Sequence, residues 1–397
     1  MTDYTENNVY IVAAKRTAIG SFQGQFVDTP APMLGATAIR ATMDQVSINP
    51  NDLEEAYIGC VLPAGLGQAP ARQAVLHAGL PLSVKCTTIN KVCGSGMKSV
   101  MMAHDTIKAG SADLIIAGGM ESMTNAPYLL PKARGGYRMG HAQMLDHMFF
   151  DGLQNPYDGN MMGVFAELCA DKYGYSREAQ DNFSAESVKR AMNAIETGLF
   201  KEEIAAVEVK SRKQTLSVSQ DEEPPKCDLA KIPTLRPAFK KENGTVTAAN
   251  ASKISDGASM TLLASADYVN KNNLTPMAKI VGHHQYAHEP EWFTTAPVSA
   301  IKDLLNKISW SVEDVDLFEI NEAFAVVTMA AMEALNIPHD KVNVHGGATA
   351  LGHPIGASGN RILVTLIHAL KNRGLKRGVA SLCIGGGEAT AIAIELV

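Results

Sequence analysis

Asn51-Asp52-Leu53-Glu54-Glu55-Ala56-Tyr57-Ile58 has a counterpart further along the chain in Glu313-Asp314-Val315-Asp316-Leu317-Phe318-Glu319-Ile320. The two stretches align without gaps, and the match extends back to Ala38-Ile39-Arg40 and Ala300-Ile301-Lys302. Apolar residues fall on apolar residues, as Leu53 does on Val315 and Ile58 on Ile320. This pattern indicates two copies of one structural unit. A chance match over so short a stretch is the alternative.

A second pair of segments supports the duplication. Cys93-Gly94-Ser95-Gly96 precedes a helical pattern and a strand that ends in Gly118-Gly119. Gly356-Ala357-Ser358-Gly359 likewise precedes a helical pattern and a strand that ends in Gly385-Gly386-Gly387. The same order of elements in both places favours two similar α/β halves.

Short apolar runs bounded by glycine predict buried strands, and segments with helical periodicity separate them. The expected helices are Gly96–Ala109 and Gly359–Asn372. The expected strands are Val9–Ala14, Ala56–Val61, Asp113–Ala117, Asp316–Ile320 and Val379–Ile384. This alternation predicts a mostly parallel sheet with helices on both faces.

The composition limits the classes of function. The chain has 397 residues, which suggests two or three domains, and its net charge of −6 disfavours a nucleic-acid binder. No apolar run is long enough to span a membrane, and the first residues do not resemble a signal peptide. The six cysteines are scattered without a CxxC pair, which favours free thiols in a reducing cytoplasm.

Between the halves, from about residue 121 to 250, the α/β pattern loosens. The segment contains turns with Gly and Pro, a helical pattern over Arg177–Thr197 and a charged run at Asp221–Lys226. It is too long for a simple loop, and long insertions in enzymes commonly bind or cover substrate. We therefore expect a substrate-binding insertion.

Cys93 lies at a predicted strand–helix junction, in Asn90-Lys91-Val92-Cys93-Gly94-Ser95-Gly96. The helix N-terminus there would favour the thiolate, and the glycines permit a sharp turn like the nucleophile elbow of hydrolases. A cysteine in a Gly-rich turn is also often structural. His353, in Gly352-His353-Pro354, fits a loop that presents an imidazole to activate a thiol, with a capping histidine as the alternative.

Two further segments place polar groups beyond strand ends, where ligands of such sheets bind. Cys383 ends a predicted strand, and the following Gly385-Gly386-Gly387 offers backbone N–H groups to an oxyanion. Asn321 follows another strand and is suited to orient water or polarise a carbonyl, with a helix N-cap as the alternative.

Together these segments resemble the thiolase family along essentially the whole chain. The signatures are Asn90–Gly96, Gly118-Gly119-Met120-Glu121-Ser122-Met123, Asn321-Glu322-Ala323-Phe324, Gly352-His353-Pro354 and Cys383–Gly387, with Gly244–Ser252 resembling the biosynthetic branch. The resemblance implies two duplicated βαβαβαββ halves in a layered α/β/α/β/α core, plus an inserted loop domain. It implies an N-terminal half over 1–120 completed by about 251–272, a loop domain over 121–250 covering coenzyme A, and a C-terminal half over 273–397.

The resemblance also implies the chemistry, a reversible acetyl-CoA C-acetyltransferase reaction that joins two acetyl-CoA into acetoacetyl-CoA and coenzyme A. Cys93 would carry the acyl group, activated by His353, and Cys383 would move the α-proton with a pKa near 8.5. One oxyanion would face His353 and a water on Asn321. The other would face the N–H groups of Cys93 and Gly385.

Coenzyme A contacts carried over from the family comprise Leu153, Met162, Phe239, Ala248, Ser252, Ala323 and Phe324 for the pantetheine, and Lys226, Asp228 and Lys231 for the nucleotide. A solvated surface is the alternative for the lysines. The coenzyme A thioesters are substrates, so no cofactor is expected. The family also implies a homotetramer built as a dimer of dimers.

Two departures from the family pattern bear on specificity. Phe293-Thr294 stands where short-chain members often carry Met-Gly, which keeps a degradative 3-ketoacyl-CoA thiolase of longer chains as the alternative function. Potassium-activated members of the family have a tyrosine near the position of Val188. This chain has no tyrosine in that segment, so no potassium site is expected. His283, His284 and His288 are expected to be loop histidines and not metal ligands.

A non-catalytic acyl-CoA or lipid scaffold is disfavoured because Cys93, His353, Cys383 and Asn321 occur together.

Overall fold

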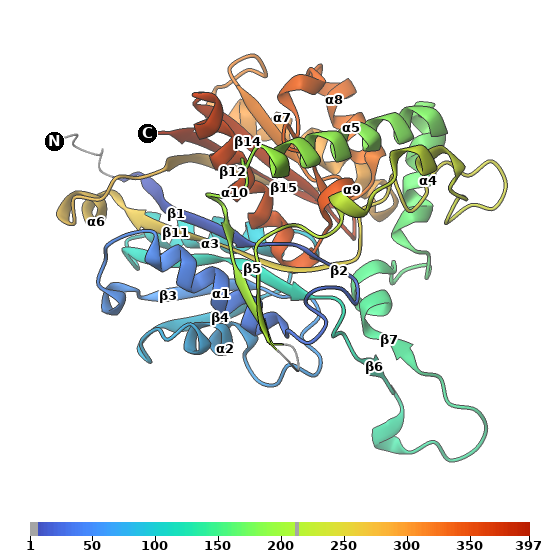
Figure 1. Cartoon of the computed structure of the whole chain (residues 1–397), viewed down its shortest axis with the longest axis horizontal. Coiled ribbons are helices and arrows are strands. Elements are labelled where there is room, and N and C mark those ends of the chain that lie inside the picture. Colours follow the sequence, from blue (N-terminus) through green and yellow to red (C-terminus); the bar gives the residue numbers. More distant parts are fainter. Residues whose placement is uncertain (1–6, 211–213) are drawn as a thin grey trace.

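The computed structural model describes residues 7–210 and 214–397. It contains two similar α/β halves whose strands join in one continuous sheet (Figure 1). The N-terminal half runs β1 (Val9–Thr17), α1 (Ala31–Asp44), β3 (Glu55–Gly59), α2 (Pro70–His77), β4 (Lys85–Ile89), α3 (Ser95–Lys108), β5 (Leu114–Ser122) and β11 (Ser255–Ser265). The C-terminal half runs β12 (Ala278–Ala287), α7 (Ala296–Ile308), β13 (Leu317–Ile320), α8 (Ala325–Leu335), α10 (Ile355–Arg373), β14 (Arg377–Ile384) and β15 (Glu388–Leu396).

This order confirms the duplication. The repeated segment forms a helix and a strand in both halves, α1 and β3 in the first and α7 and β13 in the second. The predicted helices after Cys93 and Gly359 are α3 and α10. Where β4 would have its equivalent in the second half, the described residues form a single β-bridge, between Phe318 and Val342.

The sheet is mixed, so the prediction of a mostly parallel sheet is wrong. Its strand order is β13-β14-β15-β12-β1-β11-β5-β3-β4. The pairs β3–β4, β3–β5 and β13–β14 are parallel, whereas the pairs from β5 through β11, β1, β12 and β15 to β14 are antiparallel. β15 follows β14 after a short turn and without a crossover helix, because an antiparallel neighbour needs none.

Helices divide the molecule into five layers. α1 packs on the outer face of the N-terminal strands, and α7 packs on the outer face of the C-terminal strands. α3 and α10 contact each other between the two parts of the sheet, which confirms the expected layered core. One buried cluster joins them, with Met97 and Val100 of α3 beside Ile362 and Leu363 of α10. Residues at the start of these two helices therefore lie at the interface of the halves.

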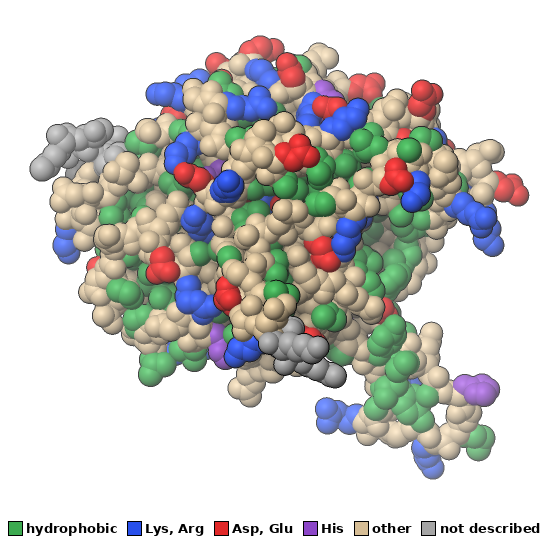
Figure 2. Space-filling view, viewed as in Figure 1, with side chains coloured by type: hydrophobic (Ala, Val, Ile, Leu, Met, Phe, Trp, Pro, Cys, Tyr) green, Lys and Arg blue, Asp and Glu red, His purple; other side chains and the backbone are tan. Residues whose placement is uncertain are grey.

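The segment between β5 and β11 contains further helices and strands. It contains α4 (Met162–Tyr173) and α5 (Arg177–Glu196), and the second agrees with the helix expected over Arg177–Thr197. Before α4, β6 (Tyr128–Leu129) and β7 (Leu145–Asp146) form an arm that stands away from the body (Figures 1 and 2). Hydrophobic side chains on the arm are exposed, among them Tyr128, Leu130, Met139 and Met144.

The other strands and α-helices described are short. They are β2 (Gly20–Ser21), β8 (Ile204–Ala205), β9 (Val207–Lys210), β10 (Thr215–Val218), α6 (Ala266–Lys271) and α9 (Ala348–Leu351). Among the helices described, none has the length and apolar content that a membrane span requires.

Candidate active site

Cys93 occupies a tight turn directly before α3. Val92 has a φ of 45°, which a β-branched residue adopts only when its surroundings impose it. Ser95 fixes the turn, because its hydroxyl accepts from the N–H of Lys91 at 2.8 Å and donates to the carbonyl of Val92 at 2.7 Å. Backbone strain next to a cysteine at a helix N-terminus is the arrangement expected of a presented nucleophile.

His353 lies in the loop between α9 and α10, as predicted, and its tautomer follows from its neighbours. The Ser358 hydroxyl donates to the carbonyl of Pro354 at 2.9 Å, so it accepts from Nδ1–H of His353 at 2.6 Å. Nε2 is then left with its lone pair, 3.5 Å from Nδ2 of Asn321. The imidazole is thus oriented to receive a proton at Nε2.

Asn321 and Cys383 reach the same place from neighbouring parallel strands. Asn321 follows β13 and its N–H donates to the carbonyl of Ser381 on β14, at 3.0 Å. Its Oδ1 is buried and has no hydrogen-bond partner in the described part of the chain, so it is available to a donor. Cys383 is fully buried two residues before Gly385, whose N–H points to the Cys93 sulfur.

Burial controls the protonation of all three titrating groups. It raises the pKa of Cys93 to about 11, against the smaller lowering effect of hydrogen bonds from the N–H groups of Gly385 and Cys93. It raises the pKa of Cys383 well above the ordinary value, with a further contribution from Cys93. It lowers the pKa of His353 to about 3, assisted by the charge of Arg361.

These directions correct two expectations. The helix N-terminus does not make Cys93 a thiolate in the free protein, because desolvation outweighs it. Cys383 does not keep a pKa near 8.5, because it is enclosed by apolar side chains. The resting site therefore pairs neutral thiols with a neutral imidazole.

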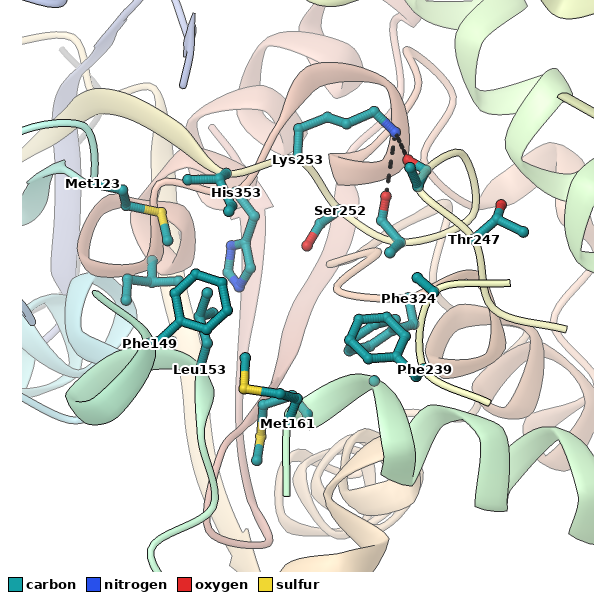
Figure 3. Close-up of a pocket in the computed structure, with 17 residues that line it drawn as sticks. Met123, Phe149, Leu153, Met161, Phe239, Thr247, Ser252, Lys253, Phe324 and His353 are labelled. Carbon is teal, nitrogen blue, oxygen red and sulfur yellow. Dashed lines mark hydrogen bonds between the residues drawn. The ribbon is translucent and has the colours of Figure 1, made fainter. Parts of the chain in front are cut away.

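A largely apolar cavity of about 260 Å³ opens beside His353 (Figure 3). Of the expected pantetheine contacts, the lining includes Leu153, Met162, Phe239, Ala248, Ser252 and Phe324. Ala323 is not part of the lining, but its carbonyl accepts from the N–H of Ser252 at 2.9 Å. Cys93 packs in a cluster with Leu153 and Ile355, and Cys383 in one with Met162 and Phe324, so both thiols adjoin the lining.

Lys226, Asp228 and Lys231 line a second cavity of about 230 Å³, which shares Ala248 and Lys253 with the first. Both expected lysines already have acidic neighbours. Lys226 donates to Glu222 at 2.7 Å, and Lys231 lies 3.3 Å from Asp228. Their side chains are 54% and 75% exposed, so they are free to turn toward a ligand.

Several residues of the first cavity were not predicted from the sequence, among them Met123, Phe149, Met161, Lys253, Ile254 and Ile355. Lys253 is the one with an available signal, since it directly follows the Gly244–Ser252 signature. Its ammonium group donates to the carbonyls of Ala248 and Ala251, and Figure 3 shows it turned away from the His353 ring. Lys253 therefore lies where the linings of the two cavities meet.

The histidines near residue 285 are placed differently from the prediction. His283 and His284 belong to strand β12, and only His288 follows it.

Phe293 is buried and packs edge-on against Phe165 and Phe324, with ring centroids 6.4 Å apart in each pair. It therefore contributes to the apolar support of the first cavity.

Comparisons with known proteins agree with this geometry. Residues 9–267 match the thiolase N-terminal domain and residues 274–396 match the thiolase C-terminal domain. The chain is 50% identical to an acetyl-CoA acetyltransferase of Chromobacterium violaceum over 98% of this chain and 99% of the relative. It is 47% identical to an acetyl-CoA acetyltransferase of Schizosaccharomyces pombe over the same shares.

Solved structures extend the comparison. A Bacillus anthracis acetyl-CoA acetyltransferase superposes with a TM-score of 0.96 at 38% identity over the whole of both chains. An Ascaris suum thiolase solved in complex with coenzyme A gives a TM-score of 0.93 at 41% identity, over 98% of this chain and 100% of that one. The fold, the site and these matches show that the chain belongs to the thiolase family.

Proposed function

We propose that this chain is an acetyl-CoA C-acetyltransferase that condenses two acetyl-CoA molecules to acetoacetyl-CoA through an acetyl group carried on Cys93. The observation that carries the proposal is the convergence of Cys93, His353, Asn321 and Cys383 beside one apolar cavity. Its full-length relatives named acetyl-CoA acetyltransferases support the same activity.

In the first half-reaction the acetyl group moves from coenzyme A to the enzyme. Nε2 of His353 accepts the thiol proton of Cys93, and the sulfur attacks the acetyl carbonyl. A new C–S bond forms, the bond to the sulfur of coenzyme A breaks, and that sulfur takes the thiol proton of Cys383. Cys383 is left as a thiolate, and Nε2 of His353 keeps the proton from Cys93. The N–H groups of Cys93 and Gly385 stabilise the oxyanion, which develops in a site from which water is largely excluded.

In the second half-reaction the Cys383 thiolate removes the α-proton of a second acetyl-CoA. The resulting carbanion attacks the acetyl-Cys93 carbonyl, a C–C bond forms, and the sulfur of Cys93 leaves and regains its proton from Nε2 of His353. Nε2–H of His353 and a water on Oδ1 of Asn321 stabilise the enolate oxygen of the second substrate. Because coenzyme A departs before the second substrate reacts, the kinetics are ping-pong.

Residues 121–250 serve as the loop domain that covers coenzyme A in this proposal. The first cavity receives the apolar pantetheine arm, and the second, with Lys226 and Lys231, receives the phosphates, for which lysine acts as a point charge. The active form is a homotetramer in the cytoplasm. The arm of β6 and β7 supports assembly, because its exposed apolar side chains remain unburied in a single chain.

Two variants separate the half-reactions. Cys93→Ser is expected to lower acetoacetyl-CoA synthesis by on the order of 10³-fold or more and to leave no acetyl adduct in the intact mass after incubation with acetyl-CoA. Cys383→Ala is expected to lose synthesis equally but to keep the acetyl adduct, which also shows that the variant is folded. An adduct in Cys93→Ser, or full turnover in either variant, would contradict the mechanism.

Cleavage of longer 3-ketoacyl-CoA is the second candidate, because Phe293 and the apolar lining leave chain length open. The test compares kcat/KM for acetoacetyl-CoA with that for a 3-ketoacyl-CoA of long chain in the direction of cleavage. A preference for acetoacetyl-CoA supports the proposal, and a preference for the long chain replaces it with the degradative function.

A further inference from the structure

His104, Asp105 and His283 converge on one point away from the candidate active site. His104 and Asp105 lie in the last turns of α3, and His283 lies on β12 of the other half. Oδ1 of Asp105 is 3.1 Å from Nδ1 of His104 and 2.8 Å from Nε2 of His283. A nitrogen of each ring therefore faces the same carboxylate oxygen, and the two rings are perpendicular, with an interplanar angle of 88° and centroids 5.0 Å apart.

The spacing of these atoms suits a metal ion. One ligand atom from each of the three side chains lies within 4.8 Å of the others. Ligands at about 2.0–2.2 Å from a tetrahedral zinc ion are separated from one another by about 3.3 Å. The two distances from Asp105 Oδ1 to the imidazole nitrogens are close to this value. The two imidazoles are only 11% and 14% exposed, while Asp105 is 60% exposed, which leaves one side open to a water ligand.

We propose that His104, Asp105 and His283 bind a divalent transition metal ion of the zinc class, with a fourth coordination position open to water. Two imidazoles and one carboxylate favour Zn²⁺, Co²⁺ or Ni²⁺ over Mg²⁺ and Ca²⁺, which prefer oxygen ligands. No metal was predicted at His283, because no pattern of cysteine or carboxylate partners accompanies it in the sequence. The fold supplies the partners from α3.

The protonation and charge around the site set its affinity. Burial lowers the pKa of both His104 and His283 despite the adjacent Asp105, so both rings are neutral at pH 7 and able to ligate. Lys98, Lys108 and Lys307 lie near enough to oppose a cation. Lys108 and Lys307 are held by the carbonyls of Asn7 and His283. We therefore expect weaker binding than at a closed four-ligand zinc site.

A bound ion would join the two halves, because it bridges α3 and β12. Binding to the folded state alone stabilises that state in proportion to the logarithm of the metal concentration. The expected result is a melting temperature that rises as the ion is added.

The test uses untagged protein freed of metal by chelation, titrated with Zn²⁺ in a calorimeter and with Co²⁺ in a spectrophotometer. Wild type is expected to bind one ion at this site, with visible Co²⁺ bands and no thiolate-to-cobalt charge-transfer band. His283→Gln keeps a hydrogen-bond donor to Asp105 but is a poor ligand. It is expected to weaken binding at least tenfold and to abolish the rise in melting temperature.

His284→Gln is the matched control, since His284 is the next residue of β12 and faces Asp303 at 3.7 Å. It is expected to bind Zn²⁺ as wild type does. His104→Ala provides a second test from α3, with its melting temperature without metal as the check of folding. No binding by wild type, equal binding by His283→Gln, or a thiolate charge-transfer band from Cys93 or Cys383 would each overturn the proposal.

Discussion

At the scale of single residues, Cys93 is subject to opposing influences on its proton. Apolar surroundings raise its pKa to about 11, while N–H groups of Gly385 and of Cys93 itself act in the other direction. Only a thiolate is a good nucleophile, and the sulfur of Cys93 is almost fully protonated at neutral pH in the free protein. In the proposed mechanism, reaction therefore depends on transfer of this proton to His353 while substrate is bound.

The pH dependence of alkylation tests this state. The rate at which iodoacetamide modifies Cys93 is expected to keep rising from pH 7 to pH 10, because the thiolate fraction grows until the pH passes about 11. An exposed thiol with an ordinary pKa would level off above about pH 8.5. Peptide mass spectrometry assigns the modification to Cys93. A plateau below pH 9 at Cys93 would show that its thiolate is stabilised.

The residues of the site were predictable to the extent that their neighbours in sequence define them. Glycines, a proline and the strand–helix junction are local signals, and they suffice to place Cys93 and His353 in turns. The protonation states were not predictable, because desolvation depends on side chains brought in from distant segments, such as Leu153 and Ile355 around Cys93. The same reason hid the pairing of His283 with Asp105.

At the scale of elements, Glu121 connects the turns that hold the two reactive groups. It lies near the end of β5 and is fully buried, and its carboxylate accepts from the N–H groups of Val61, Leu62 and Gly356 at 2.8–3.1 Å. Val61 and Leu62 belong to the cluster around Cys93, and Gly356 is the second residue of α10, which follows His353. Glu121 is therefore a positioning residue for both loops.

Replacing Glu121 with Gln removes acceptor capacity and leaves at least one buried N–H without a partner. The expected cost is about 1–3 kcal/mol, seen as a lower melting temperature, together with a lower kcat at a nearly unchanged KM. Glu208→Gln, on the exposed face of β9, is the control and is expected to change neither. Equal behaviour of the two variants would mean that Glu121 does not position the loops.

The pKa of Glu121 also predicts how the stability of the fold changes with pH. Burial raises its pKa to about 7, against the lowering effect of its N–H donors. A raised pKa stabilises the fold fully below the unfolded value of about 4.5, and this contribution is lost as the pH rises through about 7. The difference in melting temperature between wild type and Glu121→Gln is therefore expected to be larger at pH 5 than at pH 8, as thermal scans at both pH values would show.

Which elements the sequence predicted follows from how they are buried. Strands β3, β5 and β14 are continuous apolar runs, and all three were located. β12 was missed because it has a polar, partly exposed sequence at His283–Gln285, where its pairing with β15 and not its composition makes it a strand. The apolar side chains of the arm of β6 and β7 are largely exposed. Its sequence therefore has no pattern of buried positions from which its strands could be predicted.

At the scale of the whole molecule, the insertion is anchored to the core through a buried ion cluster. Arg16 of β1 binds Glu203 through Nε at 2.5 Å and binds Asp221 with two nitrogens at 2.7 and 2.9 Å. All three side chains are fully buried. Burial alone would lower the pKa of Arg16, but Asp221 and Glu203 together raise it, so the guanidinium stays charged.

Arg16→Met is expected to destabilise the protein by about 3–5 kcal/mol, because it leaves two buried carboxylates without a counter-charge. Lys15→Met is the matched control on the same strand. Lys15 is half-buried and donates mainly to the carbonyl of Glu202, so its loss should cost about 1 kcal/mol or less. Unfolding by denaturant measures both changes.

The position of the cluster makes the variant a test of how the insertion serves the site. Glu203 and Asp221 flank the segment that leads from α5 to the second cavity, where Lys226 and Lys231 lie. If the insertion holds coenzyme A, loosening it should raise KM for acetyl-CoA more than it lowers kcat, and limited proteolysis should cut first between residues 197 and 245. Addition of coenzyme A should slow that cleavage. Cleavage elsewhere, or a fall in kcat alone, would mean that the cluster supports the two halves and not the insertion.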